Sequence, residues 1–303
     1  MIDGFLCIDK PVGITSHDVV SRVRRILGTR KVGHTGTLDP FATGVLPVAV
    51  NDGTKAIPFL DEGVKCYEAV MQLGVVTDTL DMTGTVLREA DYLAVTQERI
   101  EAALNQFIGQ LNQIPPMYSA IKCDGQPLYK LARQGQVIER KPREITILSL
   151  ELLSFVPPFV GFKVTCSRGT YVRALAEDIG TRLGCGAALK ELRRLASGPF
   201  TISTAVSLEQ LDEDARTGAL GILTVTPFSA LDHLPEIILS EAGVDYVRHG
   251  RSPGWHDVVS APPMVHEEKQ FVRLTRNGDL VAVAQCTFCE EVASRITLKR
   301  VFI

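Results

Sequence analysis

The chain of 303 residues has no apolar run near the roughly 20 residues that a membrane-spanning helix needs. Its first residues, Met1-Ile2-Asp3-Gly4, lack the basic and apolar segments of a signal peptide. It also lacks a glycine-rich dinucleotide fingerprint and a phosphate-binding P-loop. We therefore expect a cytoplasmic protein without a membrane anchor and without a nucleotide cofactor.

Cysteine usage argues against both a disulfide framework and a metal centre. The seven cysteines are an odd number, and their spacing suggests no set of pairs. Cys286 and Cys289 form a Cys-x-x-Cys pair, but a structural zinc site needs about four ligands, and the chain has no second such pair. His256 and His266 could be recruited, yet core thiols are the simpler reading. We expect no bound metal.

The distribution of charged residues along the chain says more about possible partners than the net charge does. The net charge is -3, but residues 10–31 hold six basic residues and one acidic, residues 117–143 hold six and two, and residues 161–200 hold seven and three. These segments carry +13 together and leave -16 for the rest. A phosphate-binding face on an otherwise acidic protein would give this segregation, and so would three unrelated solvated surfaces.

The most informative stretch is Gly33-His34-Thr35-Gly36-Thr37-Leu38-Asp39-Pro40-Phe41-Ala42-Thr43-Gly44-Val45-Leu46-Pro47. Glycine permits backbone angles that other residues resist, and proline restricts both itself and the residue before it. Asp39 is therefore expected on a rigid bend among small neighbours, with a buried strand following from Val45. Taken alone, an Asp-Pro pair is more often a turn than a catalytic site.

This run resembles the Gly-His-Thr-Gly-x-Leu-Asp-Pro motif of the TruB family, the tRNA pseudouridine-55 synthases. The resemblance continues through separate motifs, in the same order, over about residues 4–235. It implies that Asp39 is the catalytic residue. It also implies that His34 inserts near the disrupted RNA loop, although a loop histidine bonded to backbone is the alternative.

Four further motifs of the family have counterparts in this chain. The Lys10-Pro11 motif packs beside the active site, which gives Lys10 a supporting place among the substrate-binding residues. The Lys-x-Tyr-Glu-Ala run, followed by Thr77-Asp78-Thr79-Leu80-Asp81, implies that Tyr67 stacks on the target base and contacts the reacting sugar. In the Arg-Gly-Thr-Tyr-Val-Arg run, Arg173 pairs with the catalytic aspartate and Tyr171 lines the base pocket. In the last motif, Leu192 borders the uracil.

The residues alone also allow simpler roles at these positions. Tyr67 could be a half-buried strand aromatic, Arg173 could pair with Glu177 one helical turn later, and Leu192 could belong to the core. The family resemblance favours the active-site roles of these residues over the simpler ones.

The resemblance implies an α+β protein whose catalytic fold, over residues 1–234, has a mixed, largely antiparallel central sheet flanked by helices and loops. A thumb insertion at about residues 116–143 would clamp the RNA, with Arg140, Lys141 and Arg143 as contacts, and a surface hairpin is the alternative. Residues 235–303 resemble a PUA domain, a small β-barrel that binds RNA. Asn277-Gly278 predicts a hairpin within it.

The implied reaction converts uridine to pseudouridine at position 55 in the T-arm stem-loop of tRNA. The base is flipped out, detached from N1, rotated and rejoined to the sugar through C5. No group is transferred and no redox change occurs, so no cofactor is expected, and we expect a monomer. Asp39 acts either as a nucleophile or as a base.

Two other functions are alternatives to pseudouridine synthesis. Haloacid-dehalogenase motifs place a nucleophilic aspartate before Gly-Thr, but His34 and Thr35 stand before Gly36-Thr37 here, so that rival fails. A non-catalytic RNA-binding protein remains the second hypothesis, and it predicts tRNA binding without product.

Overall fold

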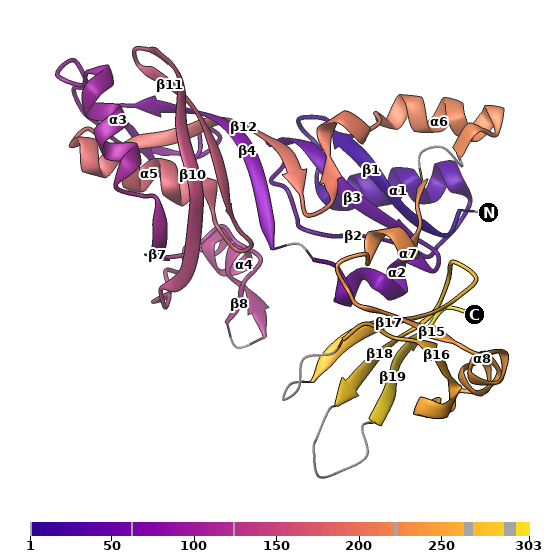
Figure 1. Ribbon diagram of the computed structural model, residues 1–303. Coiled ribbons are helices and arrows are strands. Elements are labelled where there is room, and N and C mark those ends of the chain that lie inside the picture. The colour runs from indigo at the N-terminus through magenta and orange to yellow at the C-terminus, as the bar shows by residue number, and fades with distance from the viewer. Residues whose placement is uncertain (1, 62, 124, 221–223, 264–268, 288–294) are drawn as a thin grey trace.

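The structure is a computed structural model that describes residues 2–61, 63–123, 125–220, 224–263, 269–287 and 295–303 (Figure 1). It has a large sheet with helices against it and a smaller sheet built from the C-terminal part of the chain. No helix in these ranges is both long and apolar enough to cross a membrane.

The large sheet has ten strands, eight of them in the order β14-β1-β3-β12-β4-β11-β10-β7, while β2 pairs with β3 and β13 pairs with β12. The contact between β3 and β12 is parallel and the other pairings are antiparallel, which confirms the expected mixed, largely antiparallel sheet. The strands are β1 (Gly4–Lys10), β2 (Val32–His34), β3 (Thr43–Val50), β4 (Val64–Leu73), β7 (Gly109–Gln113), β10 (Arg143–Val156), β11 (Phe159–Ser167), β12 (Ala187–Ser197), β13 (Phe200–Thr201) and β14 (Thr224–Val225).

Strand β12 differs most from what its sequence indicates. Its residues, AALKELRRLAS, include four charged side chains, and we expected only a turn at its start, around Gly184 to Leu189. The structure places the whole segment between β3 and β4, in the middle of the large sheet. Tertiary position overrides local composition here, because two of those charged residues are arginines with partners inside the fold.

Two long helices begin and end at clear signals. Helix α1 (Ser16–Leu27) opens with a capping box between Thr15 and Asp18 and ends at Gly28, whose φ of 62° is left-handed. Helix α5 (Val172–Leu183) likewise ends at a left-handed glycine, Gly184. Their apolar faces pack on different halves of the large sheet, with α1 over β1 and β3 and α5 over β4, β11 and β12.

Shorter elements fill the connections between the strands. A hairpin of β5 (Val75–Thr77) and β6 (Val86–Glu89) follows β4, and a second hairpin lies in the expected thumb. The remaining elements before the C-terminal sheet are α2 (Gly53–Ala56), α3 (Gln97–Asn105), β8 (Lys122–Cys123), β9 (Gln126–Pro127), α4 (Leu128–Arg133), α6 (Leu208–Thr217) and α7 (Pro227–Ala230).

The C-terminal sheet has five strands in the order β16-β15-β17-β18-β19. They are β15 (Glu236–Leu239), β16 (Val258–Ser260), β17 (Gln270–Arg276), β18 (Asp279–Thr287) and β19 (Arg295–Val301), with α8 (Glu241–Arg248) between β15 and β16. The predicted hairpin is confirmed, because β17 and β18 are joined by Asn277 and Gly278, both with positive φ. Figure 1 shows this sheet beside α2 and α7.

Strands β1 and β3 are buried on both faces, which explains their nearly continuous apolar sequences. Leu6 and Ile8 face the cluster formed with α1 and α6. Phe5 and Cys7 face the opposite way, into a cluster that includes Leu280 and Val283 of the C-terminal sheet. The two parts of the molecule therefore share one apolar core.

We expect this shared core to make unfolding cooperative across the two parts. Leu280→Ala removes a buried side chain, only 8% exposed, and should lower the free energy of unfolding by about 2–5 kcal/mol. Trp255 is the one tryptophan and lies in the C-terminal part, so its fluorescence reports on that part while far-UV circular dichroism reports on the whole. The two melting curves should shift together.

The control is Val259→Ala, at a side chain 62% exposed in the same sheet, which should leave both curves in place. A fluorescence transition that moves to lower temperature while the circular dichroism transition stays would contradict the shared core.

Candidate active site

The loop from Thr35 to Ala42 carries Asp39 and joins β2 to β3. Its bend closes through the Ala42 N–H, which donates to the Asp39 carbonyl at 3.1 Å. The Ser16 hydroxyl accepts from the Leu38 N–H at 2.9 Å and lies 3.2 Å from the Leu38 carbonyl, to which it donates. The first turn of α1 therefore holds the residue next to Asp39, and the predicted rigid bend is present.

Lys10 supports the same bend from the end of β1. Its side chain is fully buried, and Nζ donates to the carbonyls of Pro11 at 2.8 Å, Ile14 at 2.7 Å and Pro40 at 3.3 Å. A lysine ammonium has three N–H groups, so all are used. Burial lowers the pKa of Lys10 to about 8, and the Asp39 carboxylate opposes that fall. Lys10 thus lies behind the site with its charge toward Asp39.

Arg173 and Asp39 form a two-point ion pair. Nε of Arg173 lies 2.8 Å from Oδ2 of Asp39, and Nη2 donates to Oδ1 at 3.2 Å. The arginine side chain is 5% exposed and the aspartate side chain 35%. Arg173 lies in the first turn of α5, and its ion pairs among the described residues are with Asp39 and Asp81 rather than with Glu177. The paired fork geometry fixes the plane of the carboxylate while leaving one side of it open.

Three groups that the sequence analysis did not assign complete the surroundings of Arg173. Nη1 lies 3.6 Å from Oδ2 of Asp81 and donates to the Thr79 carbonyl at 2.9 Å. Nη2 also donates to the Tyr118 carbonyl at 2.9 Å. The run Thr77 to Asp81 signalled a motif, but only the fold shows that its last residue faces the arginine.

Asp81 is itself held firmly. Its Oδ1 accepts from the hydroxyls of Thr79 at 2.9 Å and Thr83 at 2.5 Å, and from the Thr83 N–H at 3.0 Å. The preceding Leu80 has φ 63°, a left-handed conformation that is uncommon for leucine. The turn is therefore shaped to aim one carboxylate oxygen of Asp81 at Arg173.

The pKa of Asp39 reflects competing effects. Burial raises it above its ordinary value, Arg173 opposes the rise, and the negative charge of Asp81 adds to it. Asp81 thus acts on Asp39 in two ways, by direct repulsion and by sharing the guanidinium.

The predicted pocket residues gather around this ion pair. Tyr67 on β4 and Leu192 on β12 are buried in one apolar cluster with Leu38 and Ala42, the neighbours of Asp39 along its loop. Tyr171 caps α5 two residues before Arg173, and the side-chain amide of Gln113 holds its backbone, accepting from the N–H at 2.8 Å and donating to the carbonyl at 3.1 Å.

The negative charge of Asp39 affects the pKa of both tyrosines. Burial raises the pKa of Tyr67 and of Tyr171, and Asp39 adds to the rise in each case. Each phenol therefore keeps its proton near neutral pH and is available as a hydrogen-bond donor.

His34 ends β2 at the edge of this site. Its ring meets the ring of His17, in the first turn of α1, edge to face with centroids 5.4 Å apart. No motif in the sequence marks His17 as part of the site. The pair places two imidazoles on the approach to the Asp39 loop.

The basic segments divide between the interior and the surface. Lys10, Arg173 and Arg194 are buried, so part of the segregated charge serves the fold and the site. Of the expected RNA contacts, Lys141 and Arg143 are exposed, whereas Arg140 is half-buried and donates to the Pro115 carbonyl at 3.0 Å. Two of the three cations are therefore free to meet a partner.

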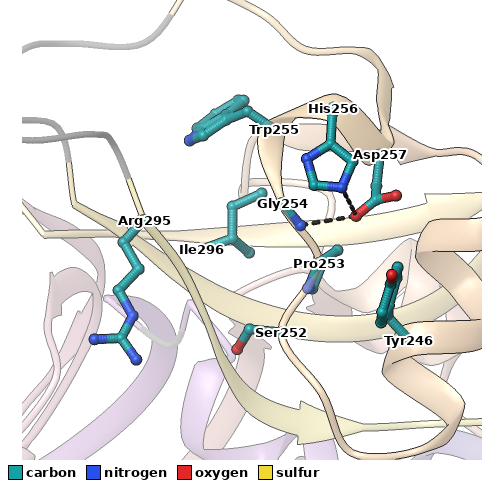
Figure 2. Close-up of a pocket in the computed structure, with 9 residues that line it drawn as sticks. All are labelled: Tyr246, Ser252, Pro253, Gly254, Trp255, His256, Asp257, Arg295 and Ile296. Carbon is teal, nitrogen blue, oxygen red and sulfur yellow. Dashed lines mark hydrogen bonds and ion pairs between the residues drawn. The ribbon is translucent and has the colours of Figure 1, made fainter.

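The C-terminal part contains Cys286, of the Cys-x-x-Cys pair that was not expected to bind metal, and a cavity lined by residues other than the predicted site. Cys286 is buried in the C-terminal sheet, while Cys289 and His266 lie outside the described residues. A cavity of about 450 Å³ lies in this part. Figure 2 shows the residues that line it, Trp255, Tyr246 and Arg295 among them. There Asp257 accepts from the Gly254 N–H at 2.8 Å, which is a capping role.

Comparisons with known proteins agree over most of the chain. Residues 24–172 match the model of the TruB family pseudouridylate synthase N-terminal domain, and residues 173–220 match that of the tRNA pseudouridylate synthase B C-terminal domain. The tRNA pseudouridine synthase B of Geotalea uraniireducens is 51% identical over 99% of this chain and 98% of that protein. Its counterpart in Geobacter sulfurreducens is 53% identical over 93% of each chain.

A solved structure is similar in fold. A chain in the crystal structure of an archaeal box H/ACA sRNP complex matches with a TM-score of 0.75 at 28% identity, covering 99% of this chain and 86% of that one.

The geometry around Arg173 predicts the direction in which Asp81 shifts the pKa of Asp39. Asp81→Asn removes a negative charge that raises this pKa and releases the guanidinium for Asp39, and both changes favour the ionised carboxylate. The pKa of Asp39 should therefore fall. Carbon-13 NMR titration of the side-chain carboxyl, assigned with Asp39→Asn, measures it.

The matched control is Asp78→Asn, in the same turn but without contact to Arg173 among the described residues, and it should leave the titration unchanged. A pKa of Asp39 that rises in Asp81→Asn would contradict the proposed electrostatics.

Proposed function

The chain belongs to the TruB family of pseudouridylate synthases, and from this premise we propose that it isomerises uridine to pseudouridine at position 55 of tRNA. The substrate region is the T-arm stem-loop. The reaction takes place in the cytoplasm and the enzyme acts as a monomer. The PUA-like residues 235–303 add RNA contacts to the catalytic part formed by residues 1–234.

One observation carries the proposal: the buried guanidinium of Arg173 binds the carboxylate of Asp39 at two points, and Asp39 lies close enough to Tyr67 and Tyr171 to add to the rise in the pKa of both. A turn cap would need no such partner. The pair holds the carboxylate in a fixed plane and favours its charged form against the effect of burial. Both candidate roles of Asp39, nucleophile and base, begin from that charged form.

The surrounding residues match the demands of the reaction. Uridine must leave the stack of a folded RNA loop, which costs a few kcal/mol. The rings of Tyr67 and Tyr171 offer an aromatic surface and hydroxyl donors to the flipped nucleotide, and Leu192 closes the apolar side. His34 inserts where the base has left. Atoms and oxidation state are conserved, so the reaction itself requires no electron acceptor or group donor.

Lys10 contributes from behind the loop. With its three N–H groups on backbone carbonyls, it fixes Pro40 rather than the substrate and brings a positive charge toward Asp39. We therefore propose that it shapes the substrate-binding site without touching the uridine.

The sharpest test of the function concerns Asp39. Asp39→Asn keeps the shape of the side chain and removes its charge, so pseudouridine formation should be lost while tRNA affinity stays within about threefold, because an interaction made toward the transition state is removed. The assay is single-turnover conversion of a tRNA transcript labelled in uridine. Wild-type enzyme should convert it, and a transcript with cytidine at position 55 should give no product.

A turn-capping aspartate predicts the opposite pattern, namely a loss of about 0.5–2 kcal/mol in stability with activity retained in the folded fraction. Thermal melts of Asp39→Asn and Asp39→Ala beside the rate measurements separate the two. Wild-type protein that binds tRNA but yields no pseudouridine would instead favour the non-catalytic RNA-binding hypothesis.

A separate prediction concerns the exposed cations of the thumb. Replacing Lys141 and Arg143 together by Ala should weaken tRNA binding and reduce the slope of log affinity against log salt by up to about 2, since each lost phosphate contact leaves counterions bound. Arg140→Ala should act mainly on local structure, through the lost bond to the Pro115 carbonyl. Binding is measured by filter retention from low to high salt.

Arg216→Ala serves as the control, because this arginine already pairs with Asp212 and Glu213 at 3.1 and 3.0 Å on α6. If the slope is as steep in the double variant as in wild type, the thumb cations do not contact phosphate.

A further inference from the structure

Arg194 on β12 has no role in the site as described so far, yet it is among the largest side chains that are fully buried. A guanidinium away from water must find acceptors for its N–H groups. Nε donates to the Val45 carbonyl at 2.6 Å and Nη2 donates to the Gly36 carbonyl at 2.8 Å. These two carbonyls lie on either side of Asp39 along the chain, so one side chain clamps both ends of its loop.

The backbone of Arg194 also fixes the loop. Gly44 is its partner across the parallel pair of β3 and β12. Gly44 has φ 97°, and a Cβ there would overlap the carbonyl oxygen of Arg194. The end of the Asp39 loop therefore rests directly on the arginine backbone and has no room to move toward it.

The same residue faces Tyr67 on its other side. Arg194 and Tyr67 are direct partners in the antiparallel pair of β12 and β4, which places their side chains on one face. Arg194 opposes the rise in the pKa of Tyr67 as a nearby cation. Its buried Nη1 has no acceptor among the described residues within ordinary hydrogen-bond geometry, so it is the donor group available to the Tyr67 hydroxyl.

This arrangement sets the direction of the Tyr67 hydroxyl. A guanidinium can only donate, so the phenol oxygen beside it must accept and must turn its own proton elsewhere. Tyr67 would then present both its ring and an O–H donor to the substrate.

We propose that Arg194 is a positioning residue for the isomerisation, which holds both ends of the Asp39 loop and orients the hydroxyl of Tyr67 so that the two groups face the uridine in one fixed frame. The inference rests on the proposed function. A purely structural arginine is the alternative, and the chain contains one for comparison. Arg273 is 8% exposed and donates to the carbonyls of Leu234, Phe228 and Asp232, far along the chain from the Asp39 loop.

The test compares Arg194→Lys with Arg273→Lys. Lysine keeps the charge but cannot bridge two carbonyls and a hydroxyl with a planar fork. Both variants should melt at lower temperature than wild type. Arg194→Lys should lower the single-turnover rate at saturating tRNA by about 10- to 100-fold, the scale of a small misplacement of reacting groups, with tRNA affinity within about threefold of wild type. Arg273→Lys should keep the wild-type rate.

Tyr67→Phe provides a second measurement that does not depend on the fold of the lysine variant. It removes the oxygen atom to which, on this proposal, Nη1 of Arg194 donates, so the melting temperature should fall by a few degrees. In the Tyr67→Phe background, Arg194→Lys should also reduce the rate by a smaller factor than in wild type, because the two act in part through one contact.

The outcomes are distinct. An active wild type whose Arg194→Lys variant is within about threefold of its rate overturns the positioning role, and so does an unchanged melting temperature in Tyr67→Phe. Equal losses of rate in Arg194→Lys and Arg273→Lys would show a general effect of instability. A wild type that makes no pseudouridine overturns the proposed function itself, whatever the variants do.

Discussion

The structure around the site depends on one buried cation. Arg173 is removed from water, which is costly for a guanidinium unless its donors and its charge are matched. The matching groups come from three separate segments of the chain: the Asp39 loop, the turn that ends at Asp81, and the entry to the thumb at Tyr118. The need to satisfy one side chain thus brings the Asp39 loop, the turn at Asp81 and the backbone of Tyr118 to a single point.

The buried and the exposed basic residues have different uses. The chain is acidic overall, and many of its basic residues are concentrated in three segments. In the structure, some of these residues are buried and others are exposed. Lys10, Arg173 and Arg194 lie inside and act on backbone carbonyls and carboxylates at short range. Lys141 and Arg143 lie outside and can act on phosphate at longer range. A count of charge along the sequence cannot separate these uses, because both require the same residue types.

The family resemblance implied the mixed sheet, whereas the bend at Asp39 and the hairpin at Asn277-Gly278 were predicted from local signals, namely glycine, proline and the Asn-Gly pair. It did not predict β12 as a central strand, since a segment rich in lysine, glutamate and arginine has no apolar alternation to read. It also left Asp81 and Arg194 unassigned. Their partners are distant in the chain: the register of β3, β12 and β4 brings Arg194 to Gly44 and Tyr67, and Asp81 meets Arg173 of α5.

Both arginines donate hydrogen bonds to main-chain carbonyl oxygens. Arg173 donates to Thr79 and Tyr118, and Arg194 donates to Gly36 and Val45. A carbonyl oxygen is supplied by whichever amino acid occupies the position, so these contacts do not depend on the side chain at the receiving end. Mutations at Tyr118 could alter how the thumb meets RNA while its attachment to Arg173 is inherited unchanged. The Tyr118 side chain can therefore change without removing the carbonyl acceptor that holds Arg173 in place.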